Sequence, residues 1–279
     1  MTTTLRPTGP LRTSTDGARS RDYEVCVNSR PVGTAQLATE PDFGNKVGRI
    51  SALRIDEADR RRGRGTVAVL AAEEVLRGWG CDQVAVSLPA DTEPALRMAT
   101  ALGYVERSRN MLKELHPEPP ALPAHVSARP VTPAEYDAWR RKEAVSFAQS
   151  WIDRGVSAEQ ARAKAAASER KFLPGGLATP HTWISHLLHD GAPVGLLWVG
   201  RNEIEPGRWT AFVYDVEVVE GERGKGYGRA LMTLAERTAR QAGDRRLALH
   251  VFTSNTPARS LYESLGYRTT SFNSYKQLL

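Results

Sequence analysis

The chain has few cysteines and no long apolar run. Its 279 residues include two cysteines, Cys26 and Cys81, which lie far apart and form no CxxC spacing. They supply no disulfide framework, which is the pattern of proteins in a reducing compartment. No stretch of about 18 residues is apolar throughout, so the sequence predicts no membrane-spanning helix. We therefore expect a cytoplasmic protein with no membrane partner.

Lysine is also scarce, with 7 residues against 31 arginines, and the formal net charge is +6. A basic balance favours anionic partners such as nucleic acid, an acidic surface or a phosphorylated small molecule, without choosing among them. The arginine-rich stretch RRRGRG at 60–65 is the main basic feature. No base-reading helix or stacking motif accompanies it, so we expect no nucleic-acid partner.

The first twenty residues are rich in Ser, Thr and Arg and poor in acids. They lack the apolar segment of a secretory signal. This composition is compatible with a transit peptide, but we expect a disordered tail over residues 1–20. The remaining length suits about two domains, and an apolar content of 41% is enough for real cores.

Two parts of the chain repeat each other. Residues 51–115 and 214–278 align without a gap at an offset of 163, with 18 identities in 65 positions. Strands and helices alternate in both copies, so we expect an α/β or α+β fold. A proline-rich linker at 117–127 separates the expected domains, which cover residues 21–116 and 128–279. We expect a monomer whose repeats form an internal pseudo-dimer.

The second copy alone has an added helical front. TPAE at 132–135 and SAEQ at 157–160 are capping boxes, and each predicts the start of a helix. The first helix carries Tyr136, Trp139 and Trp151 among charged residues. These aromatics suit either a substrate pocket or core packing, and we favour the core.

Two linked motifs carry the chemistry. R-x-x-G-x-G at 223–228 lies between a strand and a helix, where glycines let the backbone approach an anion. N-x-x-A-x-x-x-Y-x-x-x-G-Y follows at 255–267. Together they resemble the GNAT superfamily of acyl-CoA-dependent N-acyltransferases, over residues 128–279 as a whole domain and 21–116 as a shortened one. The resemblance implies that each domain is a mixed, mostly antiparallel sheet flanked by helices.

The resemblance also implies acetyl-CoA as the acyl donor and a set of residues that bind it. The backbone of the strand before the loop pairs with the pantetheine arm, the loop amides hold the pyrophosphate, and an asparagine lies beside the pantetheine. The implied cofactor-binding residues are Val216, Val218, Arg223, Gly224, Lys225, Gly226, Tyr227, Gly228, Arg229, Asn255 and Ala258. Tyr262 is implied to face the CoA sulfur.

Acyl transfer to an amine needs an acid and a base. The phenol of Tyr262 can protonate the departing thiolate. Asp215 and Glu217 share one face of a strand, because side chains alternate, and either can relieve the cost of deprotonating the amine. His250 is a third candidate, although solvated strand carboxylates and a structural histidine explain these residues equally well. His181, His186 and His189 straddle a loop and a strand, so we expect no metal.

The first copy keeps the packing residues and loses the catalytic ones. The positions of Asp215 and Glu217 hold Ala52 and Arg54, and those of Asn255 and Tyr262 hold Thr92 and Ala99. The first domain is therefore a scaffold, half of a pseudo-dimer or a regulatory CoA site, and its 60–65 loop binds a phosphate or is a basic turn. We expect the second domain to acetylate a primary amine on a small molecule or peptide by direct attack in a ternary complex. The alternatives are acetylation of a protein N-terminus or lysine, and a CoA-sensing module without turnover.

Overall fold

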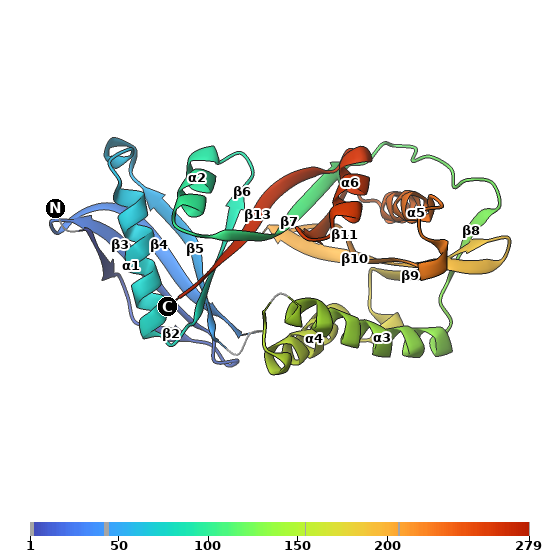
Figure 1. The fold of residues 1–279 in the computed structure, drawn as a ribbon, viewed down its shortest axis with the longest axis horizontal. Helices are drawn as coiled ribbons and strands as arrows, with labels where there is room; N and C mark the ends of the chain where they lie inside the picture. Colours follow the sequence, from blue (N-terminus) through green and yellow to red (C-terminus); the bar gives the residue numbers. More distant parts are fainter. Residues whose placement is uncertain (1–2, 42–44, 154, 206, 279) are drawn as a thin grey trace. The chain divides into compact units, whose positions relative to one another are not determined.

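The computed structural model describes residues 3–41, 45–153, 155–205 and 207–278, which form two compact units (Figure 1). The first unit comprises residues 1–107, 156–164 and 271–279, and the second comprises 108–155 and 165–270. Both units combine strands and helices, as the alternating sequence pattern predicts. No helix of the described residues is long and apolar enough to cross a membrane.

The sheet of the first unit has the strand order β1-β3-β4-β5-β6-β13, and β2 pairs with β3. All pairings are antiparallel except the parallel pair β5 and β6. Its elements are β1 (Thr3–Pro7), β2 (Arg12–Thr13), β3 (Arg19–Val27), β4 (Arg30–Glu40), β5 (Val47–Ile55), α1 (Arg64–Gly78), β6 (Gln83–Pro89), α2 (Glu93–Ala101) and the end of β13 (Arg268–Gln277).

The sheet of the second unit has the order β7-β12-β11-β10-β9-β8, and only β11 and β12 run parallel. Helix α4 begins in the first unit and belongs to the second from Ala165 onward. The elements are β7 (Val105–Glu114), β8 (Val126–Pro130), α3 (Pro133–Ile152), α4 (Ala158–Phe172), β9 (Thr182–His189), β10 (Ala192–Glu205), β11 (Arg208–Val218), α5 (Tyr227–Gln241), β12 (Arg246–Phe252) and α6 (Thr256–Ser264).

The start of the chain differs from the disordered tail expected over residues 1–20. Strand β1 pairs with β3 from Thr3 opposite Val27 to Pro7 opposite Tyr23. The side chain of Leu5 packs against the core of the first unit. Composition misses this strand because backbone pairing with an open sheet edge needs few apolar side chains.

The last strand of each repeat lies in the other unit. In the first unit, β13 pairs with β6 from Ser271 opposite Pro89 to Gln277 opposite Gln83. In the second unit, β7 pairs with β12 from Ser108 opposite Phe252 to Glu114 opposite Arg246. The units therefore differ from the domains expected at 21–116 and 128–279, because each takes one strand from the distant repeat.

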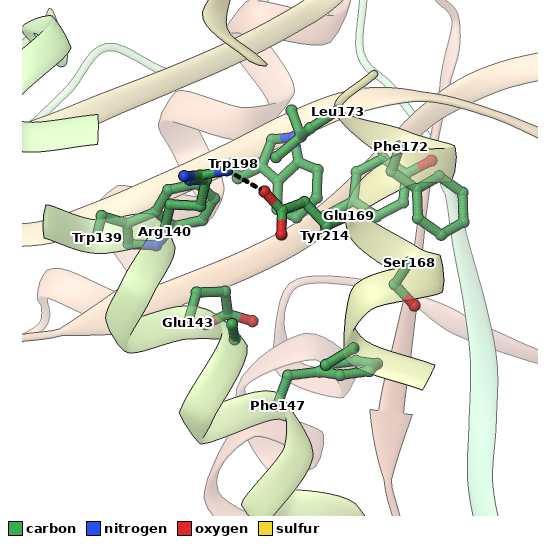
Figure 2. Close-up of a pocket in the computed structure, with 12 residues that line it drawn as sticks. Trp139, Arg140, Glu143, Phe147, Ser168, Glu169, Phe172, Leu173, Trp198 and Tyr214 are labelled. Carbon is green, nitrogen blue, oxygen red and sulfur yellow. Dashed lines mark hydrogen bonds and ion pairs between the residues drawn. The ribbon is translucent and has the colours of Figure 1, made fainter. Parts of the chain in front are cut away.

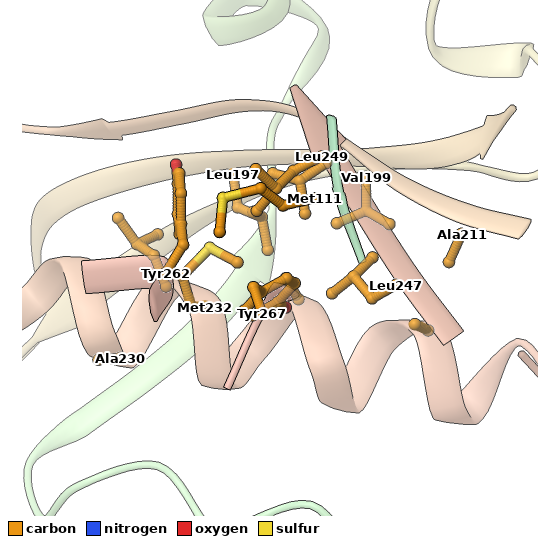
Figure 3. Packing of buried hydrophobic residues seen from close by; sticks show 14 of the residues in the cluster. Met111, Leu197, Val199, Ala211, Ala230, Met232, Leu247, Leu249, Tyr262 and Tyr267 are labelled. Carbon is orange, nitrogen blue, oxygen red and sulfur yellow. The ribbon is translucent and has the colours of Figure 1, made fainter. Parts of the chain in front are cut away.

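Each unit has its own hydrophobic core beneath one long helix. In the second unit, α5 packs with Leu231 and Met232 against strand residues such as Leu197 and Leu249 (Figure 3). Helix α1 occupies the same place in the first unit, with Leu76 fully buried. The predicted capping box at the start of α3 is present, since Thr132 and Glu135 bond each other's backbone N–H groups.

Candidate active site

An opening separates the parallel strands β11 and β12. They pair only over Ala211–Val213 and Leu247–Leu249, and a β-bulge interrupts β11 at Tyr214. Beyond the bulge, residues 215–218 pair with β10 on one side. Within the described residues no strand pairs with them on the other side. The backbone N–H and C=O groups on this side, including those of Val216 and Val218, can therefore pair with an extended ligand.

The bulge also decides which side chains face the helices α3 and α5. An extra residue shifts the alternation by one position, so Val213 and Val216 both lie on the core side of the sheet. Tyr214 packs on the opposite side, against the cluster that includes Trp139 of α3. Asp215 and Glu217 contact α3 residues and so share this second face. The same bulge recurs in the first unit, where β5 skips Ser51.

A glycine loop leads from this strand into α5. Gly224 and Gly226 have φ angles of +79° and +90°, and Gly226 is the N-cap of α5. A Cβ atom at either glycine would meet nothing within 4 Å, so the loop backbone is open. The positive end of α5 and its free N–H groups favour an anion here. The loop geometry therefore fits a pyrophosphate.

The residues of this loop have different surroundings: some side chains are paired, one is exposed and one is buried. Lys225 pairs with Glu222 at 3.0 Å, and the Arg229 guanidinium donates to Ser264 at 2.8 Å. Arg223 is exposed. Tyr227 is buried in the core, where its ring lies against the aromatic ring of His189. Gly228 allows close packing of α5 on α6, since a Cβ there would lie 3.2 Å from Leu261.

Asn255 has a role that the motif alone does not reveal. Its side-chain oxygen accepts a hydrogen bond from the backbone N–H of Ala258 and caps α6. That bond occupies the Ala258 amide, whereas the side-chain NH₂ of Asn255 has no partner among the residues that the structure describes. Thr92, the counterpart in the first unit, donates its hydroxyl to the carbonyl of Pro89 and does not cap its helix.

Tyr262 lies at the edge of the second core. The side chain is 8% exposed, and its hydroxyl points away from the packed residues (Figure 3). No described residue hydrogen-bonds this hydroxyl. Burial, and then the negative charge of Asp215, raise the pKa of Tyr262 to about 12. The phenol therefore keeps its proton at neutral pH and is free to donate it.

Three carboxylates lie within electrostatic reach of one another, and the charge of one of them, Asp215, also acts on this tyrosine. Asp215 accepts a hydrogen bond from the Trp139 indole N–H at 3.3 Å, and Glu217 pairs with Lys142. The third, Glu143 of α3, has no hydrogen bond or ion pair to any described residue. Burial, and then the charges of Asp215 and Glu217, raise the pKa of Glu143 well above its usual range. Burial and the Glu217 charge also raise the pKa of Asp215, against the lowering effect of the Trp139 hydrogen bond.

Sequence reasoning missed Glu143. An acidic residue in a helix is usually solvated, and α3 contains several charged residues. The available signal was its spacing, because Glu143 lies between Trp139 and Phe147 at intervals of four and so shares their helix face. A carboxylate on an aromatic face is the unusual feature.

Glu143 lines a cavity of about 120 Å³ between α3 and α4 (Figure 2). At its side, Arg140 of α3 and Glu169 of α4 form an ion pair at 2.5 Å. Five of the twelve lining residues are aromatic, and Trp198 stacks on Tyr214 with ring centroids 4.6 Å apart. The aromatic residues that line the cavity are Trp139, Phe147, Phe172, Trp198 and Tyr214.

The other expected aromatics and histidines have separate places. Tyr136 is buried beside Trp139, with ring centroids 5.8 Å apart, and lies outside this cavity. Trp151 packs edge-on against Phe252 and likewise does not line the cavity. His250 packs edge-on against the same Phe252 ring. Among the described residues, no three His, Cys, Asp or Glu side chains are grouped as a metal site.

The family model described as the acetyltransferase (GNAT) family matches residues 6–104 and 136–267, one stretch in each repeat. The chain belongs to this family. Some acetyltransferases are similar to part of this chain, and others are similar to most of it. N-acetyltransferase YycN of Bacillus subtilis is 41% identical over 108 residues, which is 38% of this chain and 69% of that protein. The mycothiol acetyltransferase of Thermomonospora curvata is 30% identical and aligns over 89% of this chain and 79% of its own length.

Solved GNAT structures share the two-repeat fold. The GCN5-related N-acetyltransferase from Sphaerobacter thermophilus has a TM-score of 0.57 at 21% identity, covering 92% of this chain and 80% of that one. A tandem GNAT protein from the clavulanic acid biosynthesis pathway has a TM-score of 0.53 at 20% identity, covering 95% and 85%. The chain is thus an N-acetyltransferase of a family that generally uses acetyl-CoA, and its fold is that of two GNAT domains.

Proposed function

We propose that the second unit transfers the acetyl group of acetyl-CoA directly to a primary amine in a ternary complex. The observation that supports this proposal is the opening between β11 and β12, because Asp215 lies on the stretch of β11 beyond the paired residues and its charge acts on the buried phenol of Tyr262. The pantetheine arm pairs with the backbone around Val216 and Val218. The loop amides from Arg223 to Arg229 and the front of α5 hold the pyrophosphate, and the side-chain NH₂ of Asn255 lies beside the pantetheine.

The reaction needs a neutral amine. Deprotonating a lysine-like ammonium at pH 7 costs about 4.6 kcal/mol, and an α-amino group costs only about 1 kcal/mol. Asp215 is the stronger candidate for the base, because its raised pKa brings it closer to that of an amine while leaving it able to accept a proton. Glu217 is the weaker candidate, since Lys142 already neutralises it.

The leaving group is a thiolate, whose ordinary pKa is near 8.5. The unpartnered phenol of Tyr262 donates a hydrogen bond and then a proton to the CoA sulfur as the C–S bond breaks. Overall the ammonium loses two protons in forming the amide. One passes through the base to solvent, and the other replaces the proton that Tyr262 gives to the thiolate. The first unit lacks this chemistry, since Ala99 and Ala52 replace the tyrosine and the aspartate.

A second candidate acceptor is the one used by the mycothiol acetyltransferases. It is favoured by the span of that similarity, which covers 95% of this chain for the protein of Saccharomonospora viridis, at 29% identity. Peptide and protein amines are further alternatives, because family membership does not identify an acceptor.

Calorimetric titration of acetyl-CoA into the full chain tests the proposal, with Gly226→Trp and Gly63→Trp variants beside it. Both glycines have positive φ and cap equivalent helices. We expect one catalytic site that is lost in Gly226→Trp and kept in Gly63→Trp. Two sites would make the first unit a CoA-binding regulatory domain. An absence of binding would refute the acetyltransferase assignment of the second unit.

A further inference from the structure

The cavity between α3 and α4 has a composition that selects its ligand. Five aromatic side chains line it together with Ala144, Ala165 and Leu173, and the charges of Arg140 and Glu169 neutralise each other. Glu143 is the lining carboxylate that no described residue pairs with. A wall of this kind suits a ligand with an apolar body and one positive charge.

A buried polar group of the wall gives independent support. Trp198 is 8% exposed, and its indole N–H is buried without an acceptor among the described residues. An unsatisfied buried donor costs about 1–3 kcal/mol, so it is more often kept at a site that binds a ligand than in a passive core. Trp198 thus adds to the wall of the cavity one polar group that lacks a partner among the described residues.

The size of the cavity limits the ligand. Its volume of about 120 Å³ is close to that of an engineered protein cavity of roughly 150 Å³ that binds benzene. One aromatic ring, or an alkyl chain of similar volume, fills it. A polyhydroxylated body would leave several hydroxyl groups against aromatic walls without partners, which costs affinity.

The cavity lies close to the proposed base, Asp215. Trp139 lines the cavity and donates its indole N–H to Asp215 at 3.3 Å, so the aspartate lies at the cavity wall. A cation that binds Glu143 is therefore within electrostatic reach of the base, whose charge acts on Glu143 and on Tyr262. Burial and the charges of Asp215 and Glu217 disfavour the ionised form of Glu143, and an ammonium bound there would stabilise it, so binding of the cation and ionisation of this carboxyl are coupled.

We propose that the acceptor is a small arylalkyl or alkyl primary amine, whose apolar body fills this cavity and whose ammonium is held by Glu143. The proposal rests on the acetyltransferase function of the second unit. Held there, the ammonium gives a proton to Asp215, and the free amine forms the C–N bond as the C–S bond of the thioester breaks. Glu143 acts as a specificity residue because it selects the charged end.

The test measures thiol release from acetyl-CoA by the full chain with 2-phenylethylamine and with glucosamine. Burial of one ring supports a preference of about 100-fold in kcat/KM for 2-phenylethylamine. Equal or better turnover of glucosamine would overturn the substrate class while leaving the acetyltransferase function intact. So would tight acetyl-CoA binding with neither amine acetylated. A chain that binds no acetyl-CoA would instead refute the function itself.

Two variants locate the binding. Ala144→Phe fills the cavity and should lower kcat/KM for 2-phenylethylamine by about 100-fold, mainly through KM, with acetyl-CoA affinity unchanged. Val145→Phe is its matched control, because Val145 is 70% exposed on the same helix and outside the cavity. Equal effects of the two variants, or none from Ala144→Phe, would place the acceptor elsewhere.

The charge is tested by Glu143→Gln. This variant should raise KM for 2-phenylethylamine by about 10- to 100-fold and leave inhibition by uncharged 2-phenylethanol unchanged. A purely structural role would weaken both ligands alike, and that result would remove Glu143 as the ammonium partner.

Discussion

Lys276 donates a hydrogen bond of 2.7 Å to Glu73, which lies 203 positions earlier in the chain. Lys113 makes the equivalent bond to Glu236 at 2.6 Å, and all four residues correspond across the repeats at the offset of 163. Each glutamate also accepts a hydrogen bond from the tyrosine that ends the Leu-Gly-Tyr motif, Tyr104 or Tyr267. The exchanged strands are thus fixed by the same buried triad in both units.

Loss of this lysine should destabilise the first unit. The Glu73 side chain is 5% exposed, so Lys276→Met leaves a buried charge without its partner and should cost about 3 kcal/mol. Urea unfolding of the full chain measures the change. The double variant Glu73→Gln with Lys276→Met should recover most of the loss. Arg77→Ala is the control, since the Arg77–Glu74 pair lies on the surface and its removal should barely shift the transition.

Removal of the Tyr262 hydroxyl should affect turnover and not donor binding. Tyr262→Phe keeps the buried ring but deletes the proton donor, so we expect kcat to fall by about 100-fold with acetyl-CoA affinity nearly unchanged. Steady-state kinetics and calorimetry measure the two quantities. Tyr275→Phe, in the first unit, should alter neither. If Tyr262→Phe retains full turnover, the phenol does not protonate the thiolate.

Replacement of Trp139 should change how kcat/KM falls at acidic pH. Asp215 must be ionised to accept a proton, so activity falls as the pH drops through its pKa. The Trp139 N–H stabilises the ionised form and lowers that pKa. Trp139→Phe should therefore shift the acid limb of kcat/KM by roughly half to one pH unit toward higher pH. A shift in the opposite direction, or none, would contradict Asp215 as the base.

Because the pKa of Glu143 is raised, replacing this residue with the uncharged glutamine should increase the stability of the fold by an amount that depends on pH. A carboxyl whose pKa is higher in the folded state contributes stability below the unfolded pKa and loses it as pH rises toward the folded value. Because glutamine does not titrate, Glu143→Gln should gain about 1–2 kcal/mol over the wild type between about pH 4 and pH 9. Thermal unfolding of both proteins at pH 5 and pH 9 tests this, and a difference that does not change with pH would argue against the raised pKa.

Local signals in the sequence predicted much of the second unit. The glycine spacing around Gly226, the capping box at Thr132 and the alternation of Asp215 with Val216 each depend on neighbours within a few residues. The duplication was visible because its offset is constant. Such patterns specify elements and faces, and the structure contains them.

Features that depend on distant partners were not predictable. The pairing of β13 with β6 joins strands more than 180 residues apart, and either repeat offers the same apolar pattern to that strand. The bulge at Tyr214 leaves no trace in the alternation of residue types. Glu143 acquires its significance only when α3 packs over β11, because an isolated helix would leave it in water.

The exchange of β7 and β13 between the repeats makes the second unit depend on the first repeat. Residues 108–114 are encoded in the first repeat, yet they pair with β12 of the unit that carries Tyr262. A gene that lost its first repeat would lose the end strand of the other unit's sheet along with it. Selection then preserves the first repeat as the source of that strand, whatever the first repeat binds.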